Sequence, residues 1–190
     1  MNSSTERPQA LEAIERESRA IAFSMASEFG TGALLRALAA SKPGGAFLEL
    51  GTGTGIATAW ILDGMDAGAM LETVDSEGRY VEVAKRHLGG DRRVTFHVED
   101  GVAFLRSLEG RWFDFIFADT WPGKFDRLDE TLALLKRGGL YVIDDLLPQP
   151  NWPDGHGPKV EALLADLNRR PDLIVSKLDW ASGIVVATKR

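Results

Sequence analysis

The chain has 190 residues, of which 44% are hydrophobic and 26% charged, so one soluble globular domain is expected rather than a fibrous or disordered chain. Its 22 basic and 28 acidic residues give a formal net charge of −6, which argues against binding nucleic acid mainly through phosphate contacts. The lack of cysteine excludes disulfides and zinc–thiolate sites. No apolar run is long enough to span a bilayer or to serve as a secretory signal, and we therefore expect a cytoplasmic protein without a membrane partner.

Two helices are expected before the first strand. Apolar side chains at helical spacing predict an amphipathic helix over residues 9–25, and a second helix covers 32–40 before a Pro-Gly-Gly breaker. We assign residues 1–42 to an N-terminal helical extension and 43–190 to the main domain. The apolar stripe of the first helix is a candidate for covering a ligand or for pairing two subunits in a homodimer.

Strand and helix patterns then alternate along most of the chain. Short apolar runs predict strands at 46–50, 70–75, 93–98, 113–119 and 140–147. Helical patterns fill the intervals, at 54–62, 77–88, 101–108 and 125–137. Such alternation requires right-handed crossovers and a mostly parallel sheet that is covered by helices on both faces.

The C-terminal pattern is different. After a further helix, strands at 172–178 and 182–190 are too close in sequence for a crossover, so this pair must be antiparallel. The predicted fold is α/β, a doubly wound seven-stranded Rossmann-like sheet that ends in an antiparallel hairpin. The proline-rich segment 148–158 follows the fifth strand, where open α/β sheets bind ligands, and is either a stiff connector or a substrate-facing rim.

A glycine-rich loop, ELGTGTG, joins the first strand to the next helix. Its glycines allow a sharp turn and the close approach of a ligand, and Asp75 at the end of the following strand is placed to accept ribose hydroxyls. A dinucleotide-binding loop would have a third glycine where Ile56 stands. Glu49 suits an amino group better than a pyrophosphate. These features favour S-adenosylmethionine as the ligand.

Four motifs in order, ELGTGTG, ETVDSEG, VTFHVEDG and FDFIFAD, resemble those of the class I S-adenosylmethionine-dependent methyltransferases. The stretches MASEFGTGALLRAL and DTWPGKF are similar to the catechol and caffeoyl-CoA type of small-molecule O-methyltransferase. The resemblance implies methyl transfer to an oxygen of a small molecule. It also implies a cofactor-binding set, which is Met25, Ser27, Glu49, Gly51, Thr52, Gly53, Gly55, Asp75, Ser76, Asp100, Gly101, Asp119 and Trp121.

The resemblance also assigns parts of the cofactor to this set. Glu49 and the loop glycines would lie against its methionine part, and Asp75 would bind its ribose. Asp100 and Gly101 would border the adenine, and Trp121 would cover the adenine face unless it is only a half-exposed core aromatic.

Three aspartates end neighbouring strands, Asp119 after the fourth and Asp144 and Asp145 after the fifth. Their carboxylates should meet at one edge of a parallel sheet and could bind Mg²⁺ or another divalent cation, or they only solvate loop starts. In the resembled enzymes the corresponding ligands are Asp, Asp and Asn, so Asp145 departs from the pattern.

The family's general-base lysine is also missing, because its position is occupied by Pro122. We take Asp119, Lys124 and His156 as the candidate catalytic residues, with Lys124 and His156 as alternative bases. Other readings remain open: an NAD(P)-binding oxidoreductase-type domain, an aminopropyl transferase of the spermidine synthase type, or a cofactor-binding protein without catalysis.

Overall fold

The structure is a computed structural model that describes residues 7–150 and 152–190. Residues 1–6 of the predicted N-terminal extension and Asn151 of the proline-rich segment lie outside the described residues. Within the described ranges, no helix combines the length and the apolar character that a membrane span requires.

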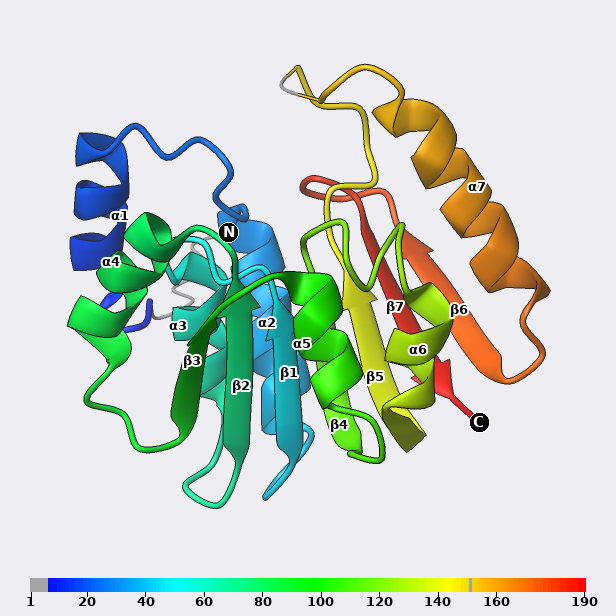
Figure 1. The fold of residues 1–190 in the computed structure, drawn as a ribbon, viewed down its shortest axis with the longest axis horizontal. Helices are drawn as coiled ribbons and strands as arrows, with labels where there is room; N and C mark the ends of the chain where they lie inside the picture. Colours follow the sequence, from blue (N-terminus) through cyan, green and yellow to red (C-terminus); the bar gives the residue numbers. More distant parts are fainter. Residues whose placement is uncertain (1–6, 151) are drawn as a thin grey trace, which may run out of the picture.

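A single seven-stranded sheet forms the centre of the molecule (Figure 1). Its strands are β1 (Ala46–Leu50), β2 (Met70–Asp75), β3 (Val94–Val98), β4 (Phe113–Ala118), β5 (Leu135–Ile143), β6 (Leu173–Leu178) and β7 (Ile184–Lys189). They lie in the order β3-β2-β1-β4-β5-β7-β6. The first five strands pair in parallel and β7 pairs antiparallel with both β5 and β6, which confirms the predicted C-terminal hairpin.

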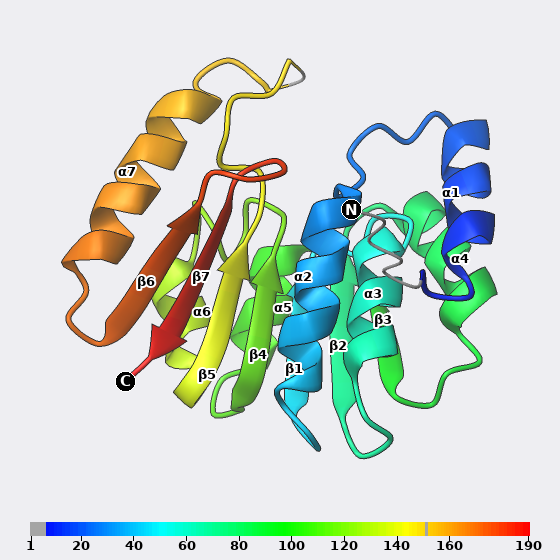
Figure 2. The ribbon, with the colours of Figure 1, turned by 180° about the vertical axis from the view of Figure 1, so that it is seen from behind.

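Helices cover both faces of this sheet. They are α1 (Leu11–Ala20), α2 (Phe29–Ala40), α3 (Ile56–Gly64), α4 (Gly78–Leu88), α5 (Gly101–Ser107), α6 (Leu128–Ala133) and α7 (His156–Arg169). Helices α5, α6 and α7 share one apolar core with the sheet. Helices α1 to α4 share the opposite core, and α2 and α3 stand in front when the molecule is seen from behind (Figure 2). The doubly wound architecture predicted from the sequence is therefore confirmed.

The first helix is shorter than predicted and ends before the segment that crosses the carboxyl edge of the sheet. Ala22 adopts a positive φ of 55°, and the Phe23 backbone N–H bonds to the Ser18 carbonyl at 2.9 Å, so the helical ladder stops there. Leu11 and Ile14 of the apolar stripe are buried in the protein's own core. The prediction of a helix through residue 25 is wrong beyond Ala20.

The region between β4 and β5 also differs from the prediction. The expected helix over 125–137 is reduced to the short α6, because the chain first forms a tight turn in which the Trp121 carbonyl accepts backbone bonds from Lys124, Phe125 and Asp126. Strand β5 then begins at Leu135, where the sequence pattern suggested the end of a helix.

Close packing of α2 against α3 gives the first prediction. A Cβ on Gly32 would lie 2.3 Å from the indole of Trp60, which is 1% exposed and cannot move into solvent. We expect Gly32→Ala to lower the free energy of unfolding by about 1–3 kcal/mol, the cost of overpacking a filled core. Urea unfolding measures this change. Gly90→Ala is the matched control, because a Cβ there meets nothing within 4 Å, and equal stabilities of the two variants would contradict the packing described.

Candidate functional site

The loop between β1 and α3 is shaped by glycine. Gly51, Gly53 and Gly55 all have positive φ, at 105°, 50° and 90°. The backbone N–H groups of Gly51 and Thr52 both donate to the Val74 carbonyl on β2, at 2.9 and 3.1 Å. The loop is thereby held at the carboxyl edge of the sheet, in a conformation that residues with a Cβ rarely adopt.

A cavity of about 150 Å³, here called the glycine-loop cavity, lies against this loop. The residues that line it include Phe23, Gly51, Gly53, Asp75, Tyr80 and Asp119. A Cβ on Gly51 would lie 3.1 Å from the Asp119 carbonyl oxygen, and one on Gly53 would lie 2.9 Å from the Phe23 ring. Side chains at these two positions would therefore collide with the segments that form the cavity wall, so glycine is needed for the wall to close in this way.

Asp75 lines the glycine-loop cavity, where the sequence predicted a ribose-binding acid. Its carboxylate accepts backbone N–H bonds from Gly53 at 2.8 Å and from Glu77 at 2.9 Å, which fix its orientation. The rings of Phe23 and Tyr80 meet edge to face at 4.7 Å in the wall of the same cavity. Sequence reasoning missed both aromatics, because they come together only where the segment between α1 and α2 meets α4, a contact between distant parts of the chain.

Glu49 lies beneath the glycine loop, is fully buried and lines neither cavity of the site. One carboxylate oxygen accepts hydroxyl bonds from Thr58 and Thr73, each at 2.6 Å, and the other oxygen has no partner. Burial raises the pKa of Glu49 to about 7. The proton that this raised pKa retains reduces the cost of burying a carboxyl oxygen without a partner.

The raised pKa of Glu49 predicts a pH-dependent stability. Because the folded protein holds this proton more tightly than the unfolded chain, the contribution is complete at low pH and is lost as the pH rises from 4.5 to about 7. We expect Glu49→Gln to escape this loss and to gain stability relative to wild type by up to about 3 kcal/mol between about pH 4 and pH 8. Urea unfolding across this range measures it, with the exposed Glu12→Gln as control. Parallel pH profiles for wild type and Glu49→Gln would contradict the prediction.

A second cavity of about 400 Å³, the aspartate cavity, adjoins the first. The predicted site residues that line it are Met25, Ser27, Asp119, Trp121, Lys124, Asp144, Asp145 and His156. Met25, Asp119 and Thr120 line both cavities. Asp119 thus lies between the glycine-loop cavity, where the cofactor is expected, and the aspartate cavity, which can hold an acceptor.

Other predicted cofactor residues do not line either cavity. Asp100 is exposed, and its carboxylate accepts a bond from the Ala103 backbone at 2.9 Å as the N-cap of α5. A Cβ on Gly55 would lie 2.8 Å from the Ala84 Cβ, so this glycine serves the packing of the loop against α4. The remaining residues outside both linings are Glu49, Thr52, Ser76 and Gly101.

The three aspartates do converge at one edge of the sheet, and one oxygen of each carboxylate accepts a hydrogen bond from the protein. Asp119 accepts from the Ser27 hydroxyl at 3.3 Å, and Asp144 accepts from the Ser182 hydroxyl and from the Asp145 backbone N–H. Burial raises the pKa values of both Asp119 and Asp144.

Asp145 lines the same cavity, but its carboxylate has a partner of its own. It has a positive φ of 62°, and its carboxylate accepts the Trp152 indole N–H at 2.7 Å. Over residues 7–150 and 152–190, no group of three or more His, Asp or Glu side chains is arranged to hold a metal ion. The divalent cation implied by the resemblance therefore has no fitting ligand set in this arrangement.

Lys124, one of the two alternative bases, has its ammonium inside this cluster. The side chain is 3% exposed, and its Nζ donates to the Asp144 carbonyl oxygen at 2.6 Å. Burial lowers the pKa of Lys124, while the carboxylates of Asp119, Asp145 and Asp144 act in the opposite direction.

His156, the other alternative, is buried at the start of α7. Its ring lies 4.4 Å from the Trp152 ring, and neither ring nitrogen has a hydrogen-bond partner. Burial and the nearby Lys124 lower the pKa of His156, which favours a neutral imidazole. Its Nε2 lies 3.6 Å from the Asp145 Oδ2, so the ring stands beside a carboxylate of the aspartate cavity.

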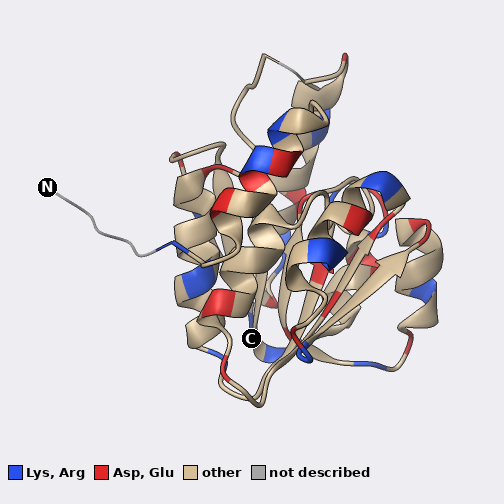
Figure 3. Ribbon diagram, turned by 90° about the vertical axis from the view of Figure 1, so that its left-hand side faces the viewer, with Lys and Arg blue, Asp and Glu red and all other residues tan. Residues whose placement is uncertain are grey.

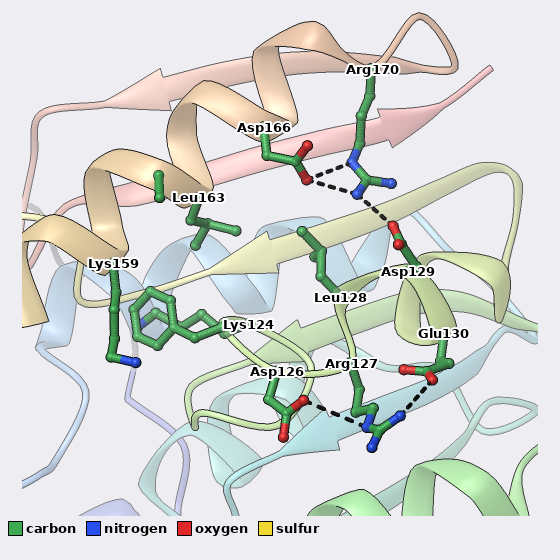
Figure 4. Close-up of a pocket in the computed structure, with 12 residues that line it drawn as sticks. Lys124, Asp126, Arg127, Leu128, Asp129, Glu130, Lys159, Leu163, Asp166 and Arg170 are labelled. Atoms are coloured by element: carbon green, nitrogen blue, oxygen red, sulfur yellow. Dashed lines mark hydrogen bonds and ion pairs between the residues drawn. The ribbon is translucent and has the colours of Figure 1, made fainter.

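A third cavity of about 510 Å³ lies between α6 and α7 (Figure 4). Its walls carry ion pairs, including Arg170 with Asp166 at 2.7 Å and Arg127 with Glu130 at 3.0 Å. In the side view of Figure 3, basic and acidic residues are likewise interspersed along the helices. Because these charges pair with one another, we place the chemistry in the two cavities at the glycine loop and the aspartates.

Comparisons with known sequences agree with this site. Residues 48–146 match the model of a family described as "Methyltransferase domain". A protein of Mycolicibacterium paratuberculosis named "Putative O-methyltransferase" is 32% identical over 117 residues, which cover 59% of this chain and 53% of that protein. The match thus spans only about half the length of that relative.

Solved structures share the fold over almost the whole chain. An O-methyltransferase from Bacillus cereus in complex with S-adenosylhomocysteine has a TM-score of 0.87 at 18% identity and covers 99% of this chain and 94% of its own. The O-methyltransferase TomG from Streptomyces achromogenes, in complex with S-adenosylmethionine, has a TM-score of 0.82 at 23% identity, with coverages of 95% and 89%. At these identities the likeness establishes a common fold.

Proposed function

The chain belongs to the methyltransferase domain family, and from this we propose that it transfers a methyl group from S-adenosylmethionine to an oxygen atom of a small molecule. One observation carries the proposal: Asp119 lines both the glycine-loop cavity and the aspartate cavity. A group-transfer enzyme must bring the reacting atoms of its donor and acceptor into contact, so the two ligands need adjoining spaces.

The glycine-loop cavity supplies the features that the cofactor needs. S-adenosylmethionine supplies an activated methyl group on a cationic sulfur when it is bound. Gly51 and Gly53 let the backbone approach it, and the Asp75 carboxylate is oriented to accept hydroxyl groups. Phe23 and Met25, from the segment between α1 and α2, add apolar side chains to its lining.

The aspartate cavity is suited to a planar acceptor. Trp121 and Trp152 contribute flat rings to its wall, and His156 contributes two nitrogens without partners. Trp121 does not line the glycine-loop cavity, so we propose that it contacts the acceptor rather than the adenine. Phe125 packs edge to face on the His156 ring, with a centroid distance of 5.1 Å.

A buried carboxylate is available for the acceptor's proton. The raised pKa of Asp119 brings its proton affinity closer to that of an activated hydroxyl, which favours general-base catalysis. We therefore assign proton acceptance to Asp119, with binding of the acceptor assigned to His156.

The experiment is an assay with methyl-labelled S-adenosylmethionine and a panel of catechols, simple phenols and aliphatic hydroxy acids. We expect S-adenosylhomocysteine and an O-methylated product with at least one hydroxylated aromatic compound. Binding of S-adenosylhomocysteine without turnover of any oxygen acceptor would contradict O-methyl transfer. A product formed only from decarboxylated S-adenosylmethionine would instead indicate aminopropyl transfer.

A further inference from the structure

We propose that the ammonium group of Lys124 is the resident cation of the aspartate cluster, which comprises Asp119, Asp144 and Asp145, and that it stands in place of a divalent metal ion. The inference concerns the aspartate cavity. It rests on the proposed function only where it says that the ammonium attracts the oxygen of a methyl acceptor. Two observations lead to it. Three aspartates line one cavity, yet the described side chains form no group of three that could hold a metal ion.

The backbone around Lys124 is fixed, so its side chain is committed to the cluster. Gly123 has a φ of 86°, and a Cβ there would lie 2.2 Å from the Leu50 side chain. The Gly123 carbonyl also accepts a bond from the buried Tyr141 hydroxyl. The turn is thus held against β1 and β5, and the lysine stem runs inward from it (Figure 4).

The ammonium has its closest hydrogen bond at the end of β5. Nζ donates to the Asp144 carbonyl oxygen at 2.6 Å, and the residue is 3% exposed. Buried carboxylates need a compensating charge, and Lys124 is the cation that lines the aspartate cavity among the described residues. A single ammonium here balances part of the negative charge and can attract an acceptor oxygen.

The carboxylates are held by other donors of the protein, and the Lys124 ammonium acts on them through its charge rather than through a hydrogen bond to any of the three. Asp145 is held by the Trp152 indole, and Asp144 is held by Ser182. A divalent ion prefers several oxygen ligands at short distance, so it would have to break these bonds and share a small buried space with a positive charge.

A second lysine nearby offers a matched comparison. Lys159 extends from α7 (Figure 4), and its Nζ lies 4.7 Å from the Trp121 ring centre. It is exposed and does not line the aspartate cavity. Removing its charge therefore leaves the cluster and its ammonium unchanged.

The test is a titration of the full chain with Mn²⁺, in which electron paramagnetic resonance reports the free ion. The variants are wild type, Lys124→Met, which keeps the length of the stem without its charge, and Lys159→Met. We expect Lys124→Met to bind Mn²⁺ at least about tenfold more tightly than wild type, because a neighbouring positive charge has been removed. Lys159→Met should bind as wild type does. Tight binding by wild type, or no gain in Lys124→Met, would overturn the inference.

A double variant covers the case in which Lys124→Met does not fold. Lys124→Met with Asp145→Asn removes one charge of each sign and leaves two aspartates and an asparagine, the set that the resembled enzymes use for their cation. We expect it to bind Mn²⁺ more tightly than Asp145→Asn alone, and equal affinities would overturn the inference. A separate titration with S-adenosylhomocysteine tests the proposed function, and a wild type that does not bind this ligand refutes the methyltransferase proposal. The Mn²⁺ titrations alone decide the role of Lys124.

Discussion

Asp75→Ala is expected to weaken the binding of S-adenosylhomocysteine by roughly 10- to 100-fold, the loss of hydrogen bonds to a charged acceptor. The Asp75 carboxylate lines the glycine-loop cavity and is already oriented by the backbone N–H groups of Gly53 and Glu77. A ligand hydroxyl therefore meets an acceptor whose position needs no rearrangement. Isothermal titration calorimetry measures the change in affinity directly.

Two further variants separate ligand binding from loop support. Asp75→Asn keeps an oxygen acceptor for one backbone N–H, so its loop should stay folded while its affinity falls by a smaller factor than in Asp75→Ala. Asp100→Ala removes the acid that the sequence placed at the adenine and that the structure has at the cap of α5. We expect its affinity to be unchanged. A larger loss in Asp100→Ala than in Asp75→Ala would contradict the site described.

Asp119→Asn is expected to lower the rate of methyl transfer by about 10²- to 10³-fold, the usual contribution of a general base. The amide keeps the volume of the carboxylate and an oxygen that can accept from Ser27, whose hydroxyl lies 3.3 Å from the Asp119 Oδ2. The loss should therefore appear in the rate and not in the affinity for S-adenosylhomocysteine. Single-turnover kinetics with an acceptor found by the panel assay separates the two quantities.

Ser27→Ala is the control for Asp119→Asn, because it removes the neighbouring hydroxyl but keeps the carboxylate. Its rate should stay much closer to that of wild type. An Asp119→Asn variant that retains most of the wild-type rate would show that the acceptor's proton goes elsewhere, and His156 would then be the residue to test.

The fold could be predicted from the sequence because its strands are short apolar runs separated by helix-length intervals. The antiparallel hairpin followed from the short connection at Trp180, since a crossover needs many more residues. The extent of α6 could not be predicted, because residues 125–137 have a helical pattern and the tight turn at Trp121 overrides it. Likewise, local periodicity did not reveal that α1 stops at Ala20.

The site was predictable where a residue type is tied to a strand end. Asp75, Asp119, Asp144 and Asp145 all came to the expected edge of the sheet. Which atoms their carboxylates bind depends on contacts between distant segments, such as the Asp145 bond to Trp152. The position of the Lys124 ammonium depends in the same way on the tight turn after Trp121, which the periodicity of the sequence does not reveal.

We infer above all that the loop after β1 binds an adenosine ligand that carries no phosphate. Calorimetric titration of the wild-type chain with S-adenosylhomocysteine, and with NAD⁺ under the same conditions, tests it most directly. The structure predicts saturable binding of S-adenosylhomocysteine at one site and no measurable binding of NAD⁺. Binding of NAD⁺ alone, or of neither ligand, would contradict it.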